Sequence, residues 1–177
     1  MANMAGIPLA NIDFSVYAGG NRFLGLAEVS LPELNFLTAE IAGAGLAGKF
    51  NANIKGMLDS AELELTFRTV TDEIGYFTTS NAVDIQIYGA QENYNASTGA
   101  LNAQQVKMNV RGFATKRALG NWKQGEQTES KVTIELLYLY VTVGGKRLCE
   151  FDKLNYKYID ANGVDHLADV RSALNRS

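Results

Sequence analysis

The stretch KQGEQTESK, from Lys123 to Lys131, gathers the side chains that come closest to an acid–base site in this sequence. Glu126 and Glu129 have the types of a general acid and its base, and Ser130 beside Lys131 has the types of a nucleophile and its base. A carboxyl group that works as a general acid normally needs apolar surroundings that raise its pKa, and this stretch contains no apolar residue. We therefore interpret it as a charged, water-facing connection without catalytic function.

The single cysteine and the single histidine are the remaining candidates for nucleophilic catalysis. Cys149 shares strand parity with Phe151, which is typical of a small side chain packed in a core. His166 falls in the first turn of a predicted C-terminal helix. One His and one Cys are also too few for the usual four-ligand nitrogen and sulfur sites, and no carboxylate cluster has calcium-loop spacing. We expect no enzyme activity, no metal and no cofactor.

The glycine-rich stretch GAGLAGKF imitates two phosphate-binding motifs. Gly43, Gly45 and Gly48 match the dinucleotide fingerprint, and the same stretch nearly matches a phosphate-binding loop. Both motifs need a helix that begins at the glycines. The sequence continues instead with KFNANIKGM, in which Phe50 and Ile54 alternate with poor helix formers. We predict an extended, flexible segment that can lie against another backbone.

The overall composition disfavours several other classes of protein. The net charge is −3 and there is no stripe of Lys and Arg, which argues against binding to a nucleic-acid backbone. A single cysteine excludes an intrachain disulfide. The N-terminus lacks the features of a signal peptide, and no apolar run approaches the roughly 20 residues that span a bilayer. We expect one soluble domain over residues 1–177, with no membrane segment.

Period-two alternation of apolar and polar residues dominates the chain and predicts strands with one wet face. The stretch AELELTF puts Leu63, Leu65 and Phe67 on one side. The stretches VDIQIY and VKMNVRG alternate in the same way, with Ile85 and Met108 on their apolar sides. The predicted fold class is therefore mainly β: an antiparallel sandwich or barrel-like subunit with one or two short α-helices.

Two short segments show helical patterns. TDEIGYF, capped by Thr71, would place Ile74 and Phe77 on one face. The C-terminal segment GVDHLADVRSALN spaces its apolar residues as a helix would, and these residues are Val164, Leu167, Val170 and Leu174. A helix of this length is marginal without tertiary packing.

The run from Val132 to Val143 breaks the alternation, because both of its faces are apolar beyond Glu135. At about 3.3 Å per residue, such a strand spans about 40 Å. Its second face must be covered, either by helices packed over a sandwich or by a neighbouring copy of the same protein. In the second case Leu137, Leu139 and Val141 are candidate contacts between subunits.

The last third of the chain resembles the major tail tube proteins of contractile-tailed bacteriophages. In that family a Lys-Gln-Gly-Glu-x-Thr-Glu-Ser-Lys stretch precedes a long apolar strand, a Gly-Lys-x-Leu-x-Glu-x-Asp segment, an Asn-Gly-Val-Asp turn and a terminal helix. The matching residues here are Lys123, Gln124, Gly125, Glu126, Thr128, Glu129, Ser130, Lys131, Gly145, Lys146, Leu148, Glu150, Asp152, Asn162, Gly163, Val164 and Asp165. The GAG at Gly43–Gly45 is similar to the glycine-rich segment of the family.

The resemblance implies a β-sandwich subunit that assembles into six-membered rings, which stack into a hollow tube. Strands of neighbouring subunits would close a β-barrel around the lumen, and an extended loop would reach the adjacent ring. On this basis we expect inter-ring contacts from Gly43–Gly56, and contacts at a subunit boundary from Lys123, Glu126, Glu129 and Lys131.

The function that the resemblance implies is structural: the subunit would build the inner tail tube through which DNA is delivered across the host envelope. Its partners would be the sheath outside, the baseplate and tail-terminator proteins at the ends, and the tape measure protein and transiting DNA in the lumen without specific binding. Such a subunit belongs to the virion and is made in the cytoplasm of the bacterial host.

Two alternatives remain open at this point. The protein could form the tube of a DNA-free contractile bacteriocin or injection system, or of a type VI secretion relative. From another class, it could be a monomeric β-barrel that binds a small ligand, which would show an apolar cavity in place of rings.

Overall fold

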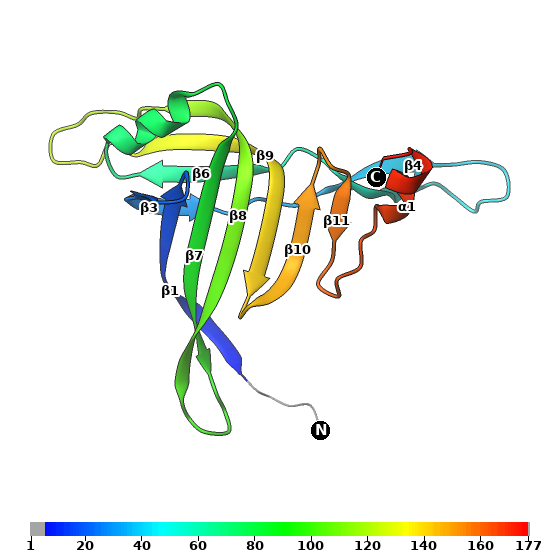
Figure 1. The fold of residues 1–177 in the computed structure, drawn as a ribbon, viewed down its shortest axis with the longest axis horizontal. Helices are drawn as coiled ribbons and strands as arrows, with labels where there is room; N and C mark the ends of the chain where they lie inside the picture. The colour runs from blue at the N-terminus through cyan, green and yellow to red at the C-terminus, as the bar shows by residue number, and fades with distance from the viewer. Residues whose placement is uncertain (1–5, 177) are drawn as a thin grey trace.

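Two antiparallel sheets and two short helices make up residues 6–176, the portion of the chain that the computed structural model describes (Figure 1). In chain order the elements are β1 (Ile7–Ala18), β2 (Arg22–Leu24), β3 (Leu26–Ser30), β4 (Phe36–Ile41), β5 (Phe50–Leu58), β6 (Glu62–Phe67), η1 (Asp72–Thr78), β7 (Val83–Tyr94), β8 (Leu101–Ala118), β9 (Ser130–Val143), β10 (Lys146–Asp152), β11 (Lys157–Ile159) and α1 (Ala168–Ala173). The predicted fold class, mainly antiparallel β with short helices, is confirmed.

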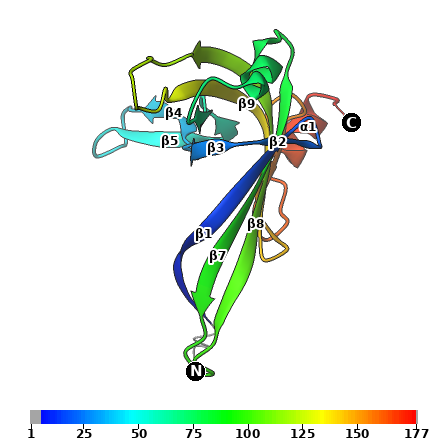
Figure 2. The same ribbon diagram turned by 90° about the vertical axis from the view of Figure 1, so that its left-hand side faces the viewer.

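The larger sheet curves over itself and supplies both layers of a sandwich (Figures 1 and 2). Seven of its strands follow the order β11-β10-β9-β8-β7-β1-β2. Strand β9 pairs with β8 along one edge, while its other edge passes from β6, at Ser130–Glu135, to β10, at Tyr138–Val143. Strand β3 extends the sheet beyond β6. Because β9 belongs to both layers, it fixes how they cross.

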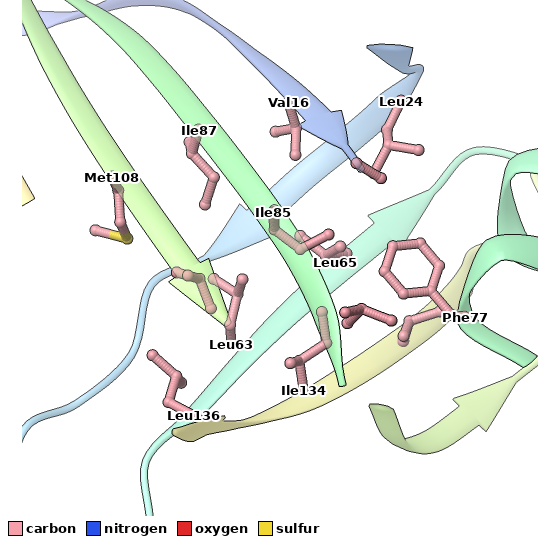
Figure 3. Close-up of a cluster of buried hydrophobic side chains, with 14 of the residues drawn as sticks. Val16, Leu24, Leu63, Leu65, Phe77, Ile85, Ile87, Met108, Ile134 and Leu136 are labelled. Carbon is pink, nitrogen blue, oxygen red and sulfur yellow. The ribbon is translucent and has the colours of Figure 1, made fainter. Parts of the chain in front are cut away.

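The space between the two layers holds the hydrophobic core (Figure 3). Strand β6 contributes Leu63 and Leu65, which are both fully buried, and β7 contributes Ile85 and Ile87 to the same cluster. Phe77 of η1 lies at one end of this cluster. The predicted apolar sides of these strands are confirmed. Full burial of one such aliphatic side chain contributes roughly 1.5–3 kcal/mol.

A β-bulge at Leu137 changes the side of β9 that faces the core. Gly112 of β8 lies opposite Leu136, and the preceding Arg111 lies opposite Tyr138, so Leu137 has no partner in β8. A single extra residue shifts the alternation of a strand by one position. The even positions of β9 therefore face the core before the bulge, and the odd positions face it afterwards.

The bulge corrects the prediction that Leu139 and Val141 contact a neighbouring subunit. Both side chains lie in the core of their own subunit, at 2% and 5% exposure. Leu137, at the bulge, is half-buried. The long apolar run therefore consists mostly of two successive segments that both face the core, the first with its even-numbered residues and the second with its odd-numbered residues. The sequence pattern alone does not distinguish this arrangement from a strand that is apolar on both faces.

The first predicted helix is present as the 3-10 helix η1, and Ile74 and Phe77 are its buried residues, as expected. The expected cap is only partly right. Thr71 occupies the N-cap position with an extended backbone, but its side chain makes no capping hydrogen bond.

The C-terminal helix is shorter than predicted, because α1 begins only at Ala168. Of its four expected apolar residues only Leu167 is well buried, at 3% exposure, whereas Val164 is 53% exposed. The segment before the helix is a turn, since the Asp160 carboxylate accepts a hydrogen bond from the backbone N–H of Val164 at 3.0 Å. Asp165 forms a β-bridge with Ile159. Side chains thus satisfy backbone groups that a longer helix would have used.

Candidate assembly surfaces

The charged loop, residues 119–129, connects β8 to β9 and projects from one end of the molecule (Figure 1). Lys123 and Glu126 form an ion pair of 3.2 Å within it, and both side chains are mostly exposed. The backbone N–H of Thr128 donates to the carbonyl of Arg68 at 2.9 Å, which ties the loop to the body. The predicted water-facing connection is confirmed. The loop projects from the body, and the hydrogen bond between Thr128 and Arg68 fixes its base.

Ser130 and Lys131 are not arranged as a nucleophile and its base. Ser130 is fully buried, and its hydroxyl donates to the carbonyl of Leu119 at 2.8 Å. Lys131 Nζ lies 2.8 Å from a carboxylate oxygen of Glu64, and the hydrogen bond to that carboxylate, together with its charge, raises the pKa of Lys131. A lysine held in its charged form cannot accept a proton.

The surroundings of Cys149 and of His166 suit structural roles. Burial raises the pKa of the Cys149 thiol, which is the opposite of nucleophile activation. His166 precedes α1, so its predicted place in the first helical turn is wrong. Its Nε2 lies 3.0 Å from Asp160 Oδ2, and its ring stacks on Tyr158 at 4.8 Å between centroids. Within residues 6–176, no group of three or more His, Cys, Asp or Glu side chains is placed to hold a metal ion.

The glycine-rich segment forms the tip of an arm. The arm, residues 36–58, consists of β4, β5 and their connection, and it makes a two-stranded sheet of its own. It projects at the opposite end of the long axis from the charged loop (Figure 1). Gly43, Gly45 and Gly48 are exposed in the connection, and strand β5, with no helix before it, begins at Phe50. The glycines form a turn, in which the backbone N–H of Leu46 donates to the carbonyl of Gly43 at 3.3 Å, so the predicted extended course holds only from Phe50 onward. The helix that a phosphate-binding motif requires is absent from residues 43–58.

The arm has one apolar side and one polar side. Ile41 lies opposite Phe50, and Ala39 lies opposite Ala52, so these residues share a side. The large apolar side chains of that side are exposed, and their exposed fractions are 36% for Leu37, 41% for Ile41, 52% for Phe50 and 43% for Ile54. Glu40, whose position in β4 is on the polar side, forms an ion pair of 3.1 Å with Lys49. A two-stranded sheet is marginally stable alone in water, so this apolar side is suited to contact with another surface.

The larger sheet has two free edges. Strand β2 covers only Val16–Ala18 of β1, so Ile7–Ser15 have no strand on the side away from β7. Strand β11 covers only Glu150–Asp152 of β10, so Lys146–Cys149 have no strand on the side away from β9. Within residues 6–176 both edges leave backbone N–H and carbonyl groups available for pairing, as edge strands do.

Two exposed features were missed by the sequence analysis. Trp122, the single tryptophan, stands in the charged loop with 87% of its surface exposed. Leu9 and Ile12 lie at two bulges of β1 with 53% and 58% exposed. The sequence did indicate the first feature, because Trp122 is the one large apolar residue between Gly120 and Glu129. The second depends on pairing between distant strands, which the sequence does not display.

Comparison with known proteins shows which proteins this chain is similar to. The chain is 32% identical over 162 residues to the tail tube protein of Escherichia phage P2, covering 89% of this chain and 91% of that one. It is 26% identical over 148 residues to the major tail tube protein of Serratia phage KSP20, covering 82% and 83%. Its fold matches the cryo-EM structure of the sheath/tube terminator of an extracellular contractile injection system with a TM-score of 0.54, at 16% identity, over 77% of this chain and 97% of that one.

The model of the family described as phage tail tube protein FII matches residues 11–174. Those residues include the arm, the charged loop, most of the free edge of β1 and all of the free edge of β10. The described residues 6–176 include no helix with the length and apolar character needed to cross a membrane. The chain belongs to the phage tail tube protein FII family.

Proposed function

We propose that this protein is the structural subunit of the inner tube of a contractile tail, and that six copies form each ring of a stacked, hollow conduit. The observation that carries the proposal is the family match over residues 11–174, together with relatives that are named as tail tube proteins. A tube of identical subunits needs two kinds of contact, one around each ring and one between rings. The subunit offers a separate surface for each.

The contact around the ring is assigned to the free sheet edges. The edge of β1 at Ile7–Ser15 and the edge of β10 at Lys146–Cys149 lie toward opposite ends of the strand order. Joining one edge to the other between neighbouring copies is a head-to-tail contact, and such a contact forms a closed ring when the rotation between neighbours is a whole fraction of a turn. The closed barrel would line the lumen and leave no edge strand exposed.

The contact between rings is assigned to the arm. Its tip carries Gly43, Gly45 and Gly48, and its apolar side carries Phe50 and Ile54, all of them exposed in the single subunit. Seating this side on the next ring would remove it from water and stabilise the hairpin at the same time.

The charged loop is assigned to a subunit boundary. Lys123 and Glu126 already pair within the loop, whereas Lys131 pairs with Glu64 of β6. Glu129 is exposed and takes a left-handed backbone conformation at φ 53°, which turns the chain into β9. Pairing with a neighbour's charges would give specificity and register more than affinity.

The proposed assembly places this protein in the virion, after synthesis in the host cytoplasm. The sheath would surround the tube, the baseplate and the tail-terminator protein would hold its ends, and the tape measure protein and DNA would pass through it without specific binding. A DNA-free bacteriocin or injection system is the second candidate, because the fold also matches a component of such a system. Head genes beside the coding gene would decide for the phage.

The ligand-binding barrel gains no support from the interior. The space between the layers is filled by the core side chains of β6, β7 and β9 (Figure 3). A recess of about 150 Å³ lies between the base of the arm and residues 151–167, and its lining combines apolar side chains such as Met57 and Leu167 with the charged Asp152, Lys153 and Lys157. This volume is below the roughly 300–1,000 Å³ of typical ligand pockets.

Electron microscopy of the purified protein tests the proposal. Negative-stain images at high and low concentration should show rings and hollow tubes. Ile54→Glu, on the apolar side of the arm, should abolish stacked tubes, whereas the matched control Asn53→Glu, on the polar side, should leave them intact. Thermal unfolding should confirm that both variants fold. A protein that stays monomeric at every concentration and binds a small molecule instead would overturn the proposal.

A further inference from the structure

The arm leaves the body through an irregular joint. Phe36 of β4 pairs with Leu58 of β5, but the next paired residue, Thr38, lies opposite Asn53. Four residues of β5, 54–57, therefore face the single residue between Phe36 and Thr38. A bulge of this size bends the strand that contains it. The direction of the arm is set at this bulge.

Gly56 lies in the bulge and is in contact with the C-terminal segment of the chain. Its φ is +64°, a left-handed conformation that glycine adopts without penalty. A Cβ at this position would lie 2.6 Å from Cγ of Leu167 and 2.7 Å from its Cδ2. Leu167 is itself 3% exposed. The leucine side chain therefore rests on bare backbone, in a space that any other residue at position 56 would occupy.

Neighbouring contacts also hold the base of the arm to the C-terminal part of the chain. Lys55 Nζ and Asp169 Oδ2 form an ion pair, and the hydrogen bond from Lys55 is the main cause that lowers the pKa of Asp169. Both side chains are largely exposed, so the pair contributes orientation more than stability. On the other strand of the arm, Phe36 packs against Tyr158 at 5.6 Å between ring centroids. At the joint, β5 thus touches Leu167 and Asp169 at the start of α1, and β4 touches Tyr158 of β11.

Leu167 is held in place by its own surroundings. Its backbone N–H donates to Asp165 Oδ1 at 3.1 Å, and the other oxygen of that carboxylate accepts from Arg171 at 2.7 Å. Arg171 also donates to the carbonyl of Tyr156 at 2.7 Å. The short α1 is therefore anchored to the turn before it, and it offers Leu167 to Gly56 as a fixed surface.

We infer that Gly56 and Leu167 are positioning residues that set the angle at which the arm leaves the subunit. The Leu167 side chain packs against the backbone of the bulge at Gly56 and limits how far the arm can turn toward α1, and the Lys55–Asp169 pair aligns the arm. The inference rests on the proposed function for its biological meaning, because the angle matters if the arm reaches the next ring. The joint itself can be tested in the unassembled subunit.

Amide hydrogen exchange measured by mass spectrometry on the full unassembled chain gives the direct readout. Gly56→Ala should make exchange within residues 36–58 faster by at least about tenfold, while the strands of the core keep their rates. The matched control is Gly99→Ala. Gly99 has a similar φ of +70° but no atom within 4 Å of an added Cβ, so that variant should leave the arm unchanged.

Two further variants separate the contact from folding defects. Leu167→Ala removes the contact without adding an atom, and it should also make exchange in the arm faster, by at least about threefold. The double variant Gly56→Ala/Leu167→Ala removes the overlap, so it should exchange more slowly than Gly56→Ala alone. If neither single variant changes exchange in the arm, or if the two effects simply add, the inference is wrong.

Electron microscopy of the same variants distinguishes this inference from the proposed function. Faster exchange together with loss of stacked tubes supports both. Faster exchange with normal tubes supports the joint and removes the arm from the contact between rings. Unchanged exchange in the arm overturns the inference about Gly56 and Leu167, whether or not tubes form.

Discussion

Three leucines of β9 test the bulge at Leu137. Leu136 and Leu139 are 3% and 2% exposed, so truncation to alanine at either position should leave a cavity and lower the free energy of unfolding by about 2–5 kcal/mol. Leu137 is half-buried and lies outside the core cluster, so Leu137→Ala should cost less than about 1 kcal/mol. For a chain of this size about 1 kcal/mol shifts the melting temperature by about 2–4 °C. The two core variants should therefore melt roughly 4–20 °C lower.

The assay is thermal and urea unfolding followed by circular dichroism, at a concentration where the subunit is unassembled. Leu148→Ala provides the matched control, because Leu148 of β10 is 53% exposed and should tolerate truncation. Uninterrupted alternation would make Leu137 and Leu139 behave alike and Leu136 differently. If Leu137→Ala proves as costly as Leu139→Ala while Leu136→Ala is neutral, the parity change at the bulge is refuted.

Three other predictions concern the loop and the C-terminal turn. Ser130→Ala should lower the free energy of unfolding by about 1–3 kcal/mol, because it removes the hydrogen bond to the Leu119 carbonyl, and equal stability in urea would contradict this. Burial alone would raise the pKa of Asp165, but hydrogen bonds from Arg171 and from backbone N–H groups lower it overall. Its ionised form therefore stabilises the fold above the ordinary carboxyl pKa of about 4, and that contribution is lost as the pH falls through the lowered value. Melting temperatures should decline in acid, and Asp165→Asn should weaken that decline. Trp122→Ala should change the unfolding free energy by less than about 0.5 kcal/mol, and the single indole should show the fluorescence of a water-exposed chromophore in the unassembled subunit.

Local alternation was enough to predict the strands that build the core. The apolar sides of β6, β7 and β8 could be read directly from Leu63, Ile85 and Met108, because a period of two survives wherever no residue is inserted. The bulge at Leu137 could not be predicted in this way, since it exists only in the pairing of β9 with β8. The C-terminal helix was predicted too long because Asp165 carries the segment before α1 into a β-bridge.

The candidate surfaces also differ in whether the sequence alone could predict them. Gly43, Gly45 and Gly48 indicated the tip of the arm, and the charged residues between Lys123 and Lys131 indicated the loop. The apolar side of the arm needed the register that sets Ile41 opposite Phe50. The free edge of β1 needed the length of β2, which is a property of the folded sheet.

The arm has no strand in common with the sheet that holds the core. Changes on its exposed side therefore leave the interior of the subunit untouched, and on the proposed function they are constrained only by the surface that receives them. Arm and receiving surface can diverge together during evolution until subunits from two related tails no longer co-assemble, although each chain still folds. On the proposed function, exchange of the exposed residues of the arm between relatives would then transfer the assembly specificity of one tube to another.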